Sequence, residues 1–311
     1  MAEPHYTVTV YVAAPGTPLL VSKGTSAAGH LYYVTSDGQN SYSYGFAPIE
    51  HGASSGPGKR FPDDNKDYQN PLYARTMEIS ADQYNKLNRF GEKPDKFGFD
   101  MKYDGVNNSC IDYTWAALNQ AGIHSSNAKG EENVTFEGAI KPASNVSDIK
   151  SIHAPYPNSE LNKEVNNPMP KRTMLQWLVT ENEALNINQL SPACQAHFDN
   201  CEAKTRELYA SNGFDYDKQN GETCTLGVAK LAADKKIMPI EFIGSNDGTI
   251  SIGNRAANGV PNYASAPSPQ IMSTSREEAV ASTLAAVAPA QTVAVAELTQ
   301  NLNQNKGRSI G

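Results

Sequence analysis

Cys110 stands where a polar loop becomes a helix. It follows Asn107-Asn108-Ser109 and opens the stretch from Cys110 to Ala121, whose apolar residues recur at the spacing of one helix face. The first turn of a helix has unpaired N–H groups and the positive end of the helix dipole, which favour a thiolate and can stabilise an oxyanion. Cys110 is therefore a candidate nucleophile. The alternative is a small buried hydrophobic residue, which is the common fate of a free cysteine.

A thiolate nucleophile needs an imidazole within hydrogen-bond reach. The sequence has six histidines, namely His5, His30, His51, His124, His153 and His197. His30 follows Gly29 at the start of an aromatic strand that precedes the Cys110 helix, whereas His51 lies at the edge of a glycine-rich loop. We predict that His30 is the base, because a loop would hold the His51 imidazole poorly. The alternative is that His30 is a surface residue or a satisfied core residue.

The remaining cysteines offer weaker chemistry. Cys224 also heads a predicted helix, which makes it a second thiolate candidate, but no histidine is beside it in the sequence. Cys194 and Cys201 lie seven residues apart, about 10 Å along a regular helix, so a disulfide between them would require the helix to break. The sequence has no CxxC pair and no glycine-rich phosphate loop. We therefore expect no metal and no cofactor.

The elements that must position these residues begin with β structure. Residues 6–12 alternate β-branched or aromatic side chains with threonines, and residues 30–34 and 42–46 flank a turn-rich segment. Together they predict an antiparallel meander. The further predicted elements are a glycine- and proline-rich loop at 51–62, a strand at 73–79, a helix from the Ser80 capping box to about Gly91, and an extended, proline-punctuated segment after Ile123.

A chain of 311 residues suggests two domains, or one large domain with an appendage. The expected fold class is α+β, with an antiparallel β meander packed on the Cys110 helix and a smaller C-terminal α/β extension. We place the first domain at residues 1–188 and a small region of helices and a β-hairpin at 189–255. Residues 256–311, rich in Ala, Ser and Gln, are expected to form a tail with one helix at 276–301, and are a candidate secretion signal.

The composition excludes several classes of protein. Lys and Arg number 26 against 33 Asp and Glu, a net charge of −7, so the chain lacks the basic footprint of a nucleic-acid-binding protein. No apolar stretch approaches the roughly 18 residues that a membrane span requires. The N-terminus lacks the basic and apolar regions of a signal peptide. We therefore expect no nucleic acid partner, no transmembrane segment and no ordinary signal-peptide export.

A series of short motifs occurs in a definite order along the first half of the chain. The motifs are Gly29-His30, Ser43-Tyr44-Gly45-Phe46-Ala47-Pro48, Gly58, Asp63-Asp64, Ile79-Ser80 with Gln83-Tyr84, and Asn108-Ser109-Cys110-Ile111-Asp112-Tyr113 with Ala121-Gly122-Ile123. Over about residues 6–175 the series resembles the circularly permuted NlpC/P60 (papain-like) cysteine hydrolases, especially those carried by bacterial antibacterial effectors. In that family the histidine strand precedes the cysteine helix.

The resemblance implies that Cys110 and His30 are the catalytic residues. Its implied reaction is hydrolysis of an amide bond in the peptide stem of peptidoglycan through an acyl-enzyme. The third polar member, which should orient the imidazole, stays open among Glu50, His51 and Asp64. The family's commoner Asn-Cys is here Asn-Ser-Cys, so the amide that forms the oxyanion hole also stays open.

The resemblance further implies a toxin with a cognate immunity protein and a secretion-system carrier as partners. Such a toxin leaves the cell by a non-Sec route, through a type VI or type IV secretion system, and acts in the periplasm of target bacteria. Residues 207–248 are similar to the C-terminal recruitment domains of type IV effectors. Two alternatives remain: a phospholipid acyl hydrolase or acyltransferase of the same permuted fold, and a non-catalytic binding or secretion-apparatus module.

Overall fold

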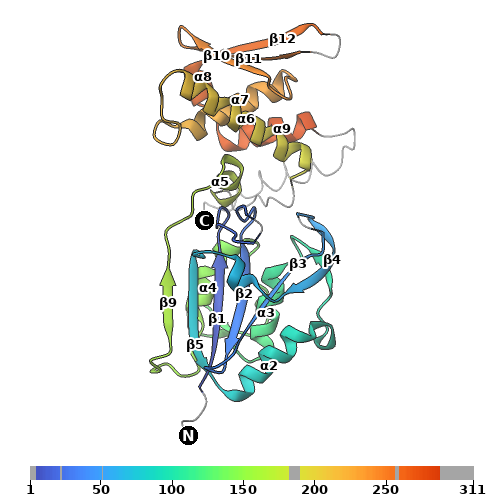
Figure 1. Ribbon diagram of the computed structural model, residues 1–311, viewed down its shortest axis with the longest axis vertical. Helices are drawn as coiled ribbons and strands as arrows, with labels where there is room; N and C mark the ends of the chain where they lie inside the picture. The colour runs from blue at the N-terminus through green and yellow to red at the C-terminus, as the bar shows by residue number, and fades with distance from the viewer. Residues whose placement is uncertain (1–4, 22, 51, 182–189, 256–258, 288–311) are drawn as a thin grey trace. The chain divides into compact units, whose positions relative to one another are not determined.

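The computed structural model describes residues 5–21, 23–50, 52–181, 190–255 and 259–287. The chain divides into two compact units (Figure 1). The first consists of residues 1–172 with 179–189, and the second consists of residues 173–178 with 190–311. Both candidate catalytic residues belong to the first unit.

An antiparallel sheet of seven strands organises the first unit, in the order β6-β4-β3-β2-β1-β5-β9 (Figure 1). The strands are β1 (Tyr6–Ala13), β2 (His30–Ser36), β3 (Ser41–Pro48), β4 (Ser55–Phe61), β5 (Tyr73–Ile79), β6 (Lys102–Asp104) and β9 (Lys163–Asn166). The predicted meander and the strand at 73–79 are therefore confirmed. The β2–β3 turn forms because Asp37 Oδ1 accepts hydrogen bonds from the amides of Gln39 and Asn40, at 2.8 and 2.6 Å.

Helices and short elements complete this unit. They are α1 (Asp64–Asp67), α2 (Ala81–Glu92), the 3-10 turns η1 (Pro94–Phe97) and η2 (Pro142–Asn145), α3 (Cys110–Gln120), α4 (Val146–Ser151), and the two-residue strands β7 (Ser125–Ser126) and β8 (Glu132–Asn133). The predicted helices after Ser80 and at Cys110 are thus confirmed. The overall result is an α+β fold, with the Cys110 helix packed on the antiparallel sheet, as expected.

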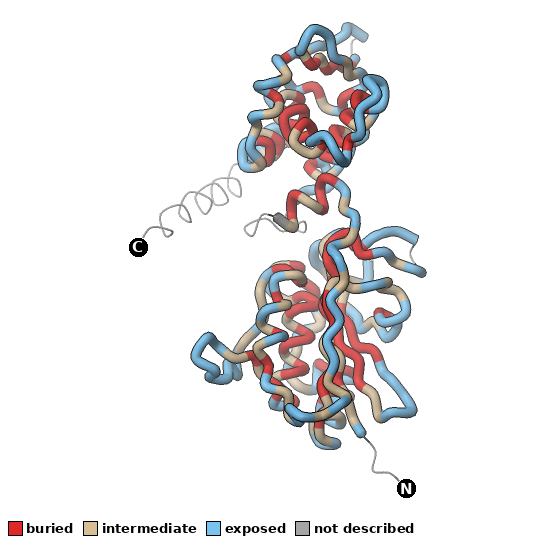
Figure 2. Tube along the Cα trace, turned by 90° about the vertical axis from the view of Figure 1, so that its left-hand side faces the viewer, coloured by how far each residue is buried: buried red, intermediate tan, exposed pale blue. Residues whose placement is uncertain are grey.

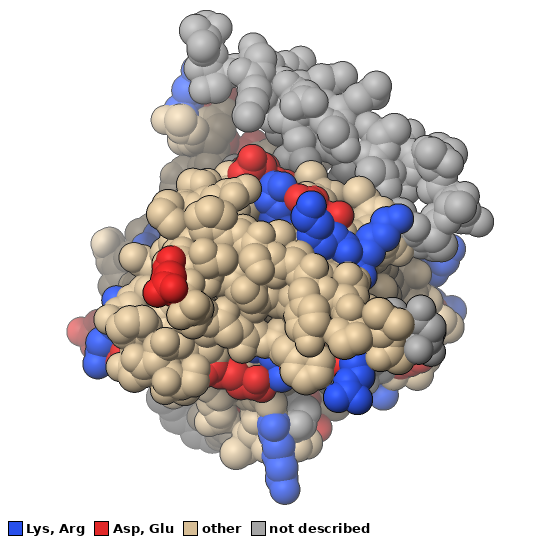
Figure 3. Space-filling view, turned by 90° about the horizontal axis from the view of Figure 1, so that it is seen from above, with Lys and Arg blue, Asp and Glu red and all other residues tan. Residues whose placement is uncertain are grey.

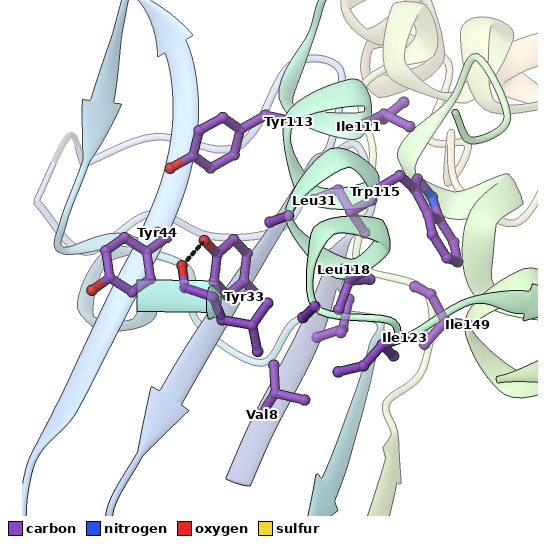
Figure 4. Close-up of a cluster of buried hydrophobic side chains, with 14 of the residues drawn as sticks. Val8, Leu31, Tyr33, Tyr44, Ile111, Tyr113, Trp115, Leu118, Ile123 and Ile149 are labelled. Carbon is purple, nitrogen blue, oxygen red and sulfur yellow. Dashed lines mark hydrogen bonds between the residues drawn. The ribbon is translucent and has the colours of Figure 1, made fainter. Parts of the chain in front are cut away.

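The core of the first unit lies between the sheet and α3. Buried side chains of α3 and β2 belong to one core: the Tyr113 ring of α3 stacks with the Tyr33 ring of β2 at 6.3 Å between centroids, and Ile111 and Trp115 lie on the other side of α3 (Figure 4). Figure 2 shows the buried positions running along the central strands and this helix. In addition, the Thr114 hydroxyl donates to the Leu31 carbonyl at 3.2 Å. This packing fixes the start of α3 relative to the start of β2, where His30 lies.

Two predictions about loops in this unit are wrong. Residues 51–62 were predicted as a loop, but β4 occupies 55–61 and pairs with both β3 and β6. Glycine and proline suggest a turn in isolation, yet a Cβ on Gly58 would lie 2.3 Å from the Phe46 ring, so the glycine lets the strands approach. The segment after Ile123 also holds more regular structure than predicted, namely α4 and the edge strand β9.

The second unit contains helices and a three-stranded antiparallel sheet in the order β10-β11-β12. Its elements are α6 (Pro192–Ser211), α7 (Gly221–Asp234), β10 (Phe242–Asn246), β11 (Thr249–Arg255), β12 (Pro261–Pro267), α8 (Ser268–Met272) and α9 (Arg276–Val287); helix α5 (Met174–Glu181) crosses the division between the units. The predicted helices and the hairpin at Asn246-Asp247-Gly248 are present. On the face seen in Figure 3, Lys and Arg side chains gather beside Asp and Glu near the upper edge, and most of the middle is uncharged.

The predicted boundaries of the C-terminal parts need correction. The expected split into 189–255 and a tail at 256–311 is wrong for residues 261–287, because β12 pairs with β11 along seven residues and α9 buries Ala279, Val280 and Thr283. A composition of small residues is a weak sequence signal for a folded element, but small side chains allow α9 to pack closely on α7. The predicted helix at 276–301 is confirmed from Arg276 to Val287, and the rest of its predicted range lies outside the described residues. The first domain boundary was predicted after residue 188, and the two units divide after Gln189. Residues 173–178, however, belong to the second unit and not to the first.

Among the described residues, no helix combines the length and apolar character needed to cross a bilayer. All four cysteines are free. Cys194 and Cys201 both lie in the unbroken helix α6, which is the arrangement that prevents a disulfide between them.

Candidate active site

Cys110 is the first residue of α3 and is 6% exposed. Ser109 caps the helix: its hydroxyl accepts from the Ile111 amide at 3.2 Å and donates to Asp112 Oδ2 at 2.9 Å. Asp112 Oδ2 in turn accepts from the Ser109 amide at 2.7 Å. This reciprocal cap satisfies helix-terminal amides and holds the first turn in one conformation. The thiol is therefore attached to a rigid helix start.

His30 is the first residue of β2 and is 5% exposed. Its backbone pairs with Ala13 of β1. Gly29 enters the strand at a φ of +84°, and a Cβ there would lie 2.6 Å from the Ala13 carbonyl oxygen, so only glycine fits this approach. The Cys110 side chain lies near enough to the His30 imidazole to raise its pKa. The structure thus brings together the two residues that the sequence analysis selected.

Asp64 is the third polar residue of the site. Its Oδ2 lies 2.8 Å from His30 Nε2, and it is 7% exposed at the start of α1. Of the three candidates left open by the sequence, Glu50 is exposed and His51 lies outside the described residues. The sequence offered Asp64 as a candidate because it occurs in the motif series, but it could not show that Asp64 meets His30. The two residues are 34 apart in sequence and come together through the pairing of β2, β3 and β4.

The three side chains form a chain of contacts from thiol to imidazole to carboxylate. Because Nε2 of His30 faces Asp64, Nδ1 is the ring nitrogen left for Cys110. A carboxylate on the far nitrogen orients an imidazole and stabilises its protonated form. This is the arrangement that acid–base catalysis by a cysteine nucleophile requires.

The electrostatics of the site favour a charged His30. Burial by itself lowers the pKa of this imidazole, but the charges of Asp64 and Cys110 and their hydrogen bonds outweigh it and raise the pKa to about 10. At neutral pH His30 is therefore an imidazolium, which lies between the Asp64 side chain and the Cys110 sulfur. An imidazolium beside a sulfur atom stabilises the thiolate form of that sulfur.

Aromatic rings hold the imidazole in place. The Tyr68 ring stacks on the His30 ring with centroids 4.9 Å apart and planes 17° apart, and Tyr32 lies 5.7 Å away. Neither tyrosine can compete for the proton, since burial raises the pKa of both phenols well above the usual value. Sequence analysis gave no role to either ring, because their contact with His30 depends on the tertiary fold.

Gly45 of β3 makes room for the carboxylate. A Cβ at this position would lie 1.7 Å from Asp64 Oδ2 and 2.8 Å from His30 Nε2. Any side chain would therefore displace the hydrogen bond between these two residues. Gly45 belongs to the motif series quoted above, although the sequence alone gave no reason for a glycine there.

The amide of Cys110 is the first donor available to an oxyanion. It donates to none of the described residues, as expected for the first N–H of a helix. Asn108, the residue whose spacing differs from the family pattern, is occupied elsewhere: its side chain donates to the carbonyls of Asp100 and Lys102 at 2.8 and 2.6 Å. Within the described part of the chain the Tyr103 hydroxyl also has no hydrogen-bond partner, and it lines the same cavity as Cys110. Burial raises the pKa of Tyr103 well above its usual range, so it stays a donor.

Two cavities adjoin the candidate catalytic residues. The first contains Cys110 and Tyr103, and its walls include the apolar residues Ile111, Ile140 and Pro142. The second contains His30 and Asp64. Cys110 and His30, whose side chains interact electrostatically, therefore line different cavities.

The other cysteines do not form comparable sites. Cys224 lies inside the first turn of α7, and burial raises its pKa to about 11, so it is a protonated thiol at neutral pH and not the thiolate considered above. In α6 the sulfur of Cys201 lies 3.7 Å from His197 Nε2, a contact that sequence analysis missed. Burial raises the pKa of Cys201 and lowers that of His197, so both groups are neutral. Among the described residues no carboxylate contacts this second Cys–His pair, and His197 Nε2 instead lies 3.1 Å from the Ala229 carbonyl oxygen.

In the part of the chain that is described, His, Cys, Asp and Glu side chains form no group of three or more that could hold a metal ion. Comparison with known proteins found no matching family model, no matching curated protein and no matching solved structure.

Proposed function

We propose that this chain is a cysteine hydrolase with Cys110 as nucleophile, His30 as general acid and base, and Asp64 as the group that orients His30. The observation that carries the proposal is the buried chain of contacts from Cys110 through His30 to Asp64, in which His30 Nε2 lies 2.8 Å from the carboxylate. A rigid helix start on one side and a cavity beside the thiol support the same interpretation.

The geometry supports a two-step acyl transfer. The Cys110 thiolate attacks the carbonyl carbon, and the oxyanion is stabilised by the Cys110 amide and the Tyr103 hydroxyl. His30 then gives its Nδ1 proton to the leaving amine as the carbon–nitrogen bond breaks, which leaves a thioester. In the second step His30 takes a proton from water, whose oxygen attacks the thioester and releases the acid and the thiolate.

The proposed substrate is an amide bond in the peptide stem of bacterial peptidoglycan. The motif series over residues 6–175 supports this choice, since it resembles permuted, papain-like NlpC/P60 hydrolases of antibacterial effectors. In this proposal the first unit is the catalytic domain. The protein is secreted by a non-Sec route, acts in the periplasm of target bacteria, and has a cognate immunity protein and a secretion-system carrier as partners.

A second candidate is hydrolysis or transfer of a phospholipid acyl group. The apolar residues around Cys110, Ile111 and Ile140 among them, favour it because they suit a hydrocarbon chain next to the nucleophile. In this second mechanism the same thiolate attacks an ester carbonyl, and His30 protonates the leaving alkoxide.

One experiment separates the candidates. Purified sacculi and phospholipid vesicles are each incubated with the wild-type protein and with Cys110→Ala, and the products are analysed by mass spectrometry. New muropeptides from the wild-type protein alone support the first proposal and locate the bond, whereas free fatty acid supports the second. If neither product forms and iodoacetamide fails to label Cys110 below pH 8, the chain is a non-catalytic module.

A further inference from the structure

The second cavity is large enough to hold part of a substrate. Its volume is about 500 Å³, within the range of small-molecule sites. His30 and Asp64 form part of its wall, and it shares no residue with the cavity at Cys110. A scissile bond at the thiol therefore has two separate cavities available, one for each side of the bond. Because His30 protonates the leaving amine, the cavity on the His30 side suits the leaving group.

The walls of this cavity are largely apolar. Leu19 and Val21 come from the loop after β1, and Ile49 and Phe61 come from the ends of β3 and β4. Val21 is 72% exposed and Ile49 is 56% exposed. Covering such exposed apolar side chains with an apolar group of a ligand removes their surface from water, which lowers the free energy and favours binding.

One cation in the wall of the cavity has no acidic partner among the described residues, whereas its carboxylates do have partners. Asp64 contacts His30, Asp63 pairs with Lys66 at 2.6 Å, and Asp67 accepts from the Val21 amide at 2.7 Å, so each acidic group has a partner. Lys59 instead lies over the Phe61 ring, 4.9 Å from its centroid, and no carboxylate among the described residues pairs with it. A ligand carboxylate would give this ammonium group its missing partner.

We propose that this cavity is the leaving-group subsite and that it takes an amine with an apolar side chain and a nearby carboxylate, such as a hydrophobic amino acid. Leu19, Val21, Ile49 and Phe61 contact the side chain, and Lys59 pairs with the carboxylate. This inference rests on the proposed cysteine hydrolase function. It adds that the bond cut lies on the amino side of such a residue.

Acyl transfer to added amines tests the subsite directly. p-Nitrophenyl acetate acylates Cys110, the His30 proton passes to the leaving oxygen, and the p-nitrophenol released is measured as its phenolate; the acetyl thioester then reacts with water or with an added amine. The amine nitrogen attacks the carbonyl carbon, the carbon–sulfur bond breaks, and the amine proton passes to His30. Leucine, leucinamide and glycine are compared, each at the same concentration of unprotonated amine, by the ratio of acetylated amine to acetate. Leucine should exceed both of the others by at least about threefold, a preference of the size that a partly exposed ion pair or apolar contact supplies.

Variants assign the preference to its residues. Lys59→Ala should make leucine and leucinamide equal, and Ile49→Ser should reduce the preference for leucine over glycine. Lys86→Ala, a lysine of α2 paired with Asp82, is the matched control and should behave as wild type. Equal transfer to leucine and leucinamide by the wild-type protein overturns the subsite.

A binding measurement keeps the subsite and the catalytic proposal apart. Saturation-transfer NMR on leucine with Cys110→Ala should show binding that Lys59→Ala weakens. If p-nitrophenolate release does not depend on Cys110 but leucine still binds through Lys59, the catalytic proposal fails and the binding site remains. If release depends on Cys110 but leucine does not bind, the subsite alone fails.

Discussion

Ser80 and Ser109 cap neighbouring helices in the same way. Each is an N-cap residue whose hydroxyl accepts a first-turn amide at 3.2 Å, and each has its own amide bound by the side chain three residues later, Gln83 for α2 and Asp112 for α3. Of these two helices, α3 is the one that begins at the proposed nucleophile. The two serines are therefore a natural pair for separating stability from catalysis.

Ser80→Ala and Ser109→Ala should each lower the free energy of unfolding by about 1 kcal/mol, because each removes one N-cap hydrogen bond. Ser109→Ala should also lower kcat, since a frayed first turn misplaces both the thiol and the Cys110 amide. Urea unfolding and kcat are measured on both variants. An equal loss of kcat in the two variants would show that general stability, and not the position of Cys110, controls activity.

Gly45→Ala should reduce the rate about as much as Asp64→Ala does, because the added methyl group occupies the space of Asp64 Oδ2. The double variant should be no slower than either single variant, since both changes remove the same hydrogen bond. Gly244→Ala is the control, because a Cβ there meets nothing within 4 Å. Losses that multiply in the double variant would mean that Gly45 acts independently of Asp64. Circular dichroism checks that each variant is folded.

Cys110→Ala should abolish hydrolysis and leave the melting temperature nearly unchanged, because alanine is well tolerated in the first turn of a helix. Cys224→Ala, which removes a buried thiol of the second unit, should keep full activity. Iodoacetamide should label Cys110 well below pH 8 and leave the other three cysteines unlabelled, as peptide mass spectrometry can show. Substantial activity in Cys110→Ala would make the mechanism wrong.

His30→Ala should reduce kcat/KM by about the same factor as Cys110→Ala, because nucleophile and base act as one unit. Removing both should therefore cost little more than removing either one. His197→Ala serves as the control for a histidine that also contacts a cysteine sulfur, and it should retain activity. A loss in the double variant equal to the product of the single losses would contradict a shared role.

Much of the fold and part of the site follow from local sequence patterns. Alternation between residues 6 and 46, the Ser80 capping box and the apolar stripe after Cys110 each depend on neighbours within a few residues, so they were predicted correctly. Cys110 could be selected because a helix N-terminus has a sequence signal. Strand β4 could not be predicted from the sequence, since its glycine and proline residues form a strand only through pairing with β3 and β6.

The rest of the site depends on contacts between distant segments. Asp64 meets His30 across 34 residues, and Gly45 matters only because Asp64 comes close to it. Nothing local to these residues distinguishes Asp64 from Glu50. Likewise, β12 and α9 gain their structure from β11 and α7, which is why a small-residue composition suggested a tail.

Asp64→Asn should move the alkaline limb of the pH–rate profile to lower pH. Burial lowers the pKa of His30, but the Asp64 and Cys110 charges outweigh it and raise this pKa to about 10, so the protonated imidazole that serves as general acid persists to about that pH. The substituted side-chain amide keeps a polar group at the same place but removes the charge. The profile of kcat/KM between pH 6 and pH 11 is compared for the two proteins, and an unchanged limb would mean that His30 ionisation does not control it.

The same ionisation predicts a pH dependence of stability. The pKa of His30 is raised in the folded state above the unfolded value of about 6.5. Its contribution to the free energy of unfolding is therefore fully present below about pH 6.5 and is lost as the pH rises towards 10. Asp64→Asn should weaken this decline, because without the carboxylate His30 loses its proton at lower pH. Urea unfolding of both proteins at pH 6 and pH 9.5 measures the difference, and parallel losses of stability in the two would rule out the Asp64–His30 pair as its source.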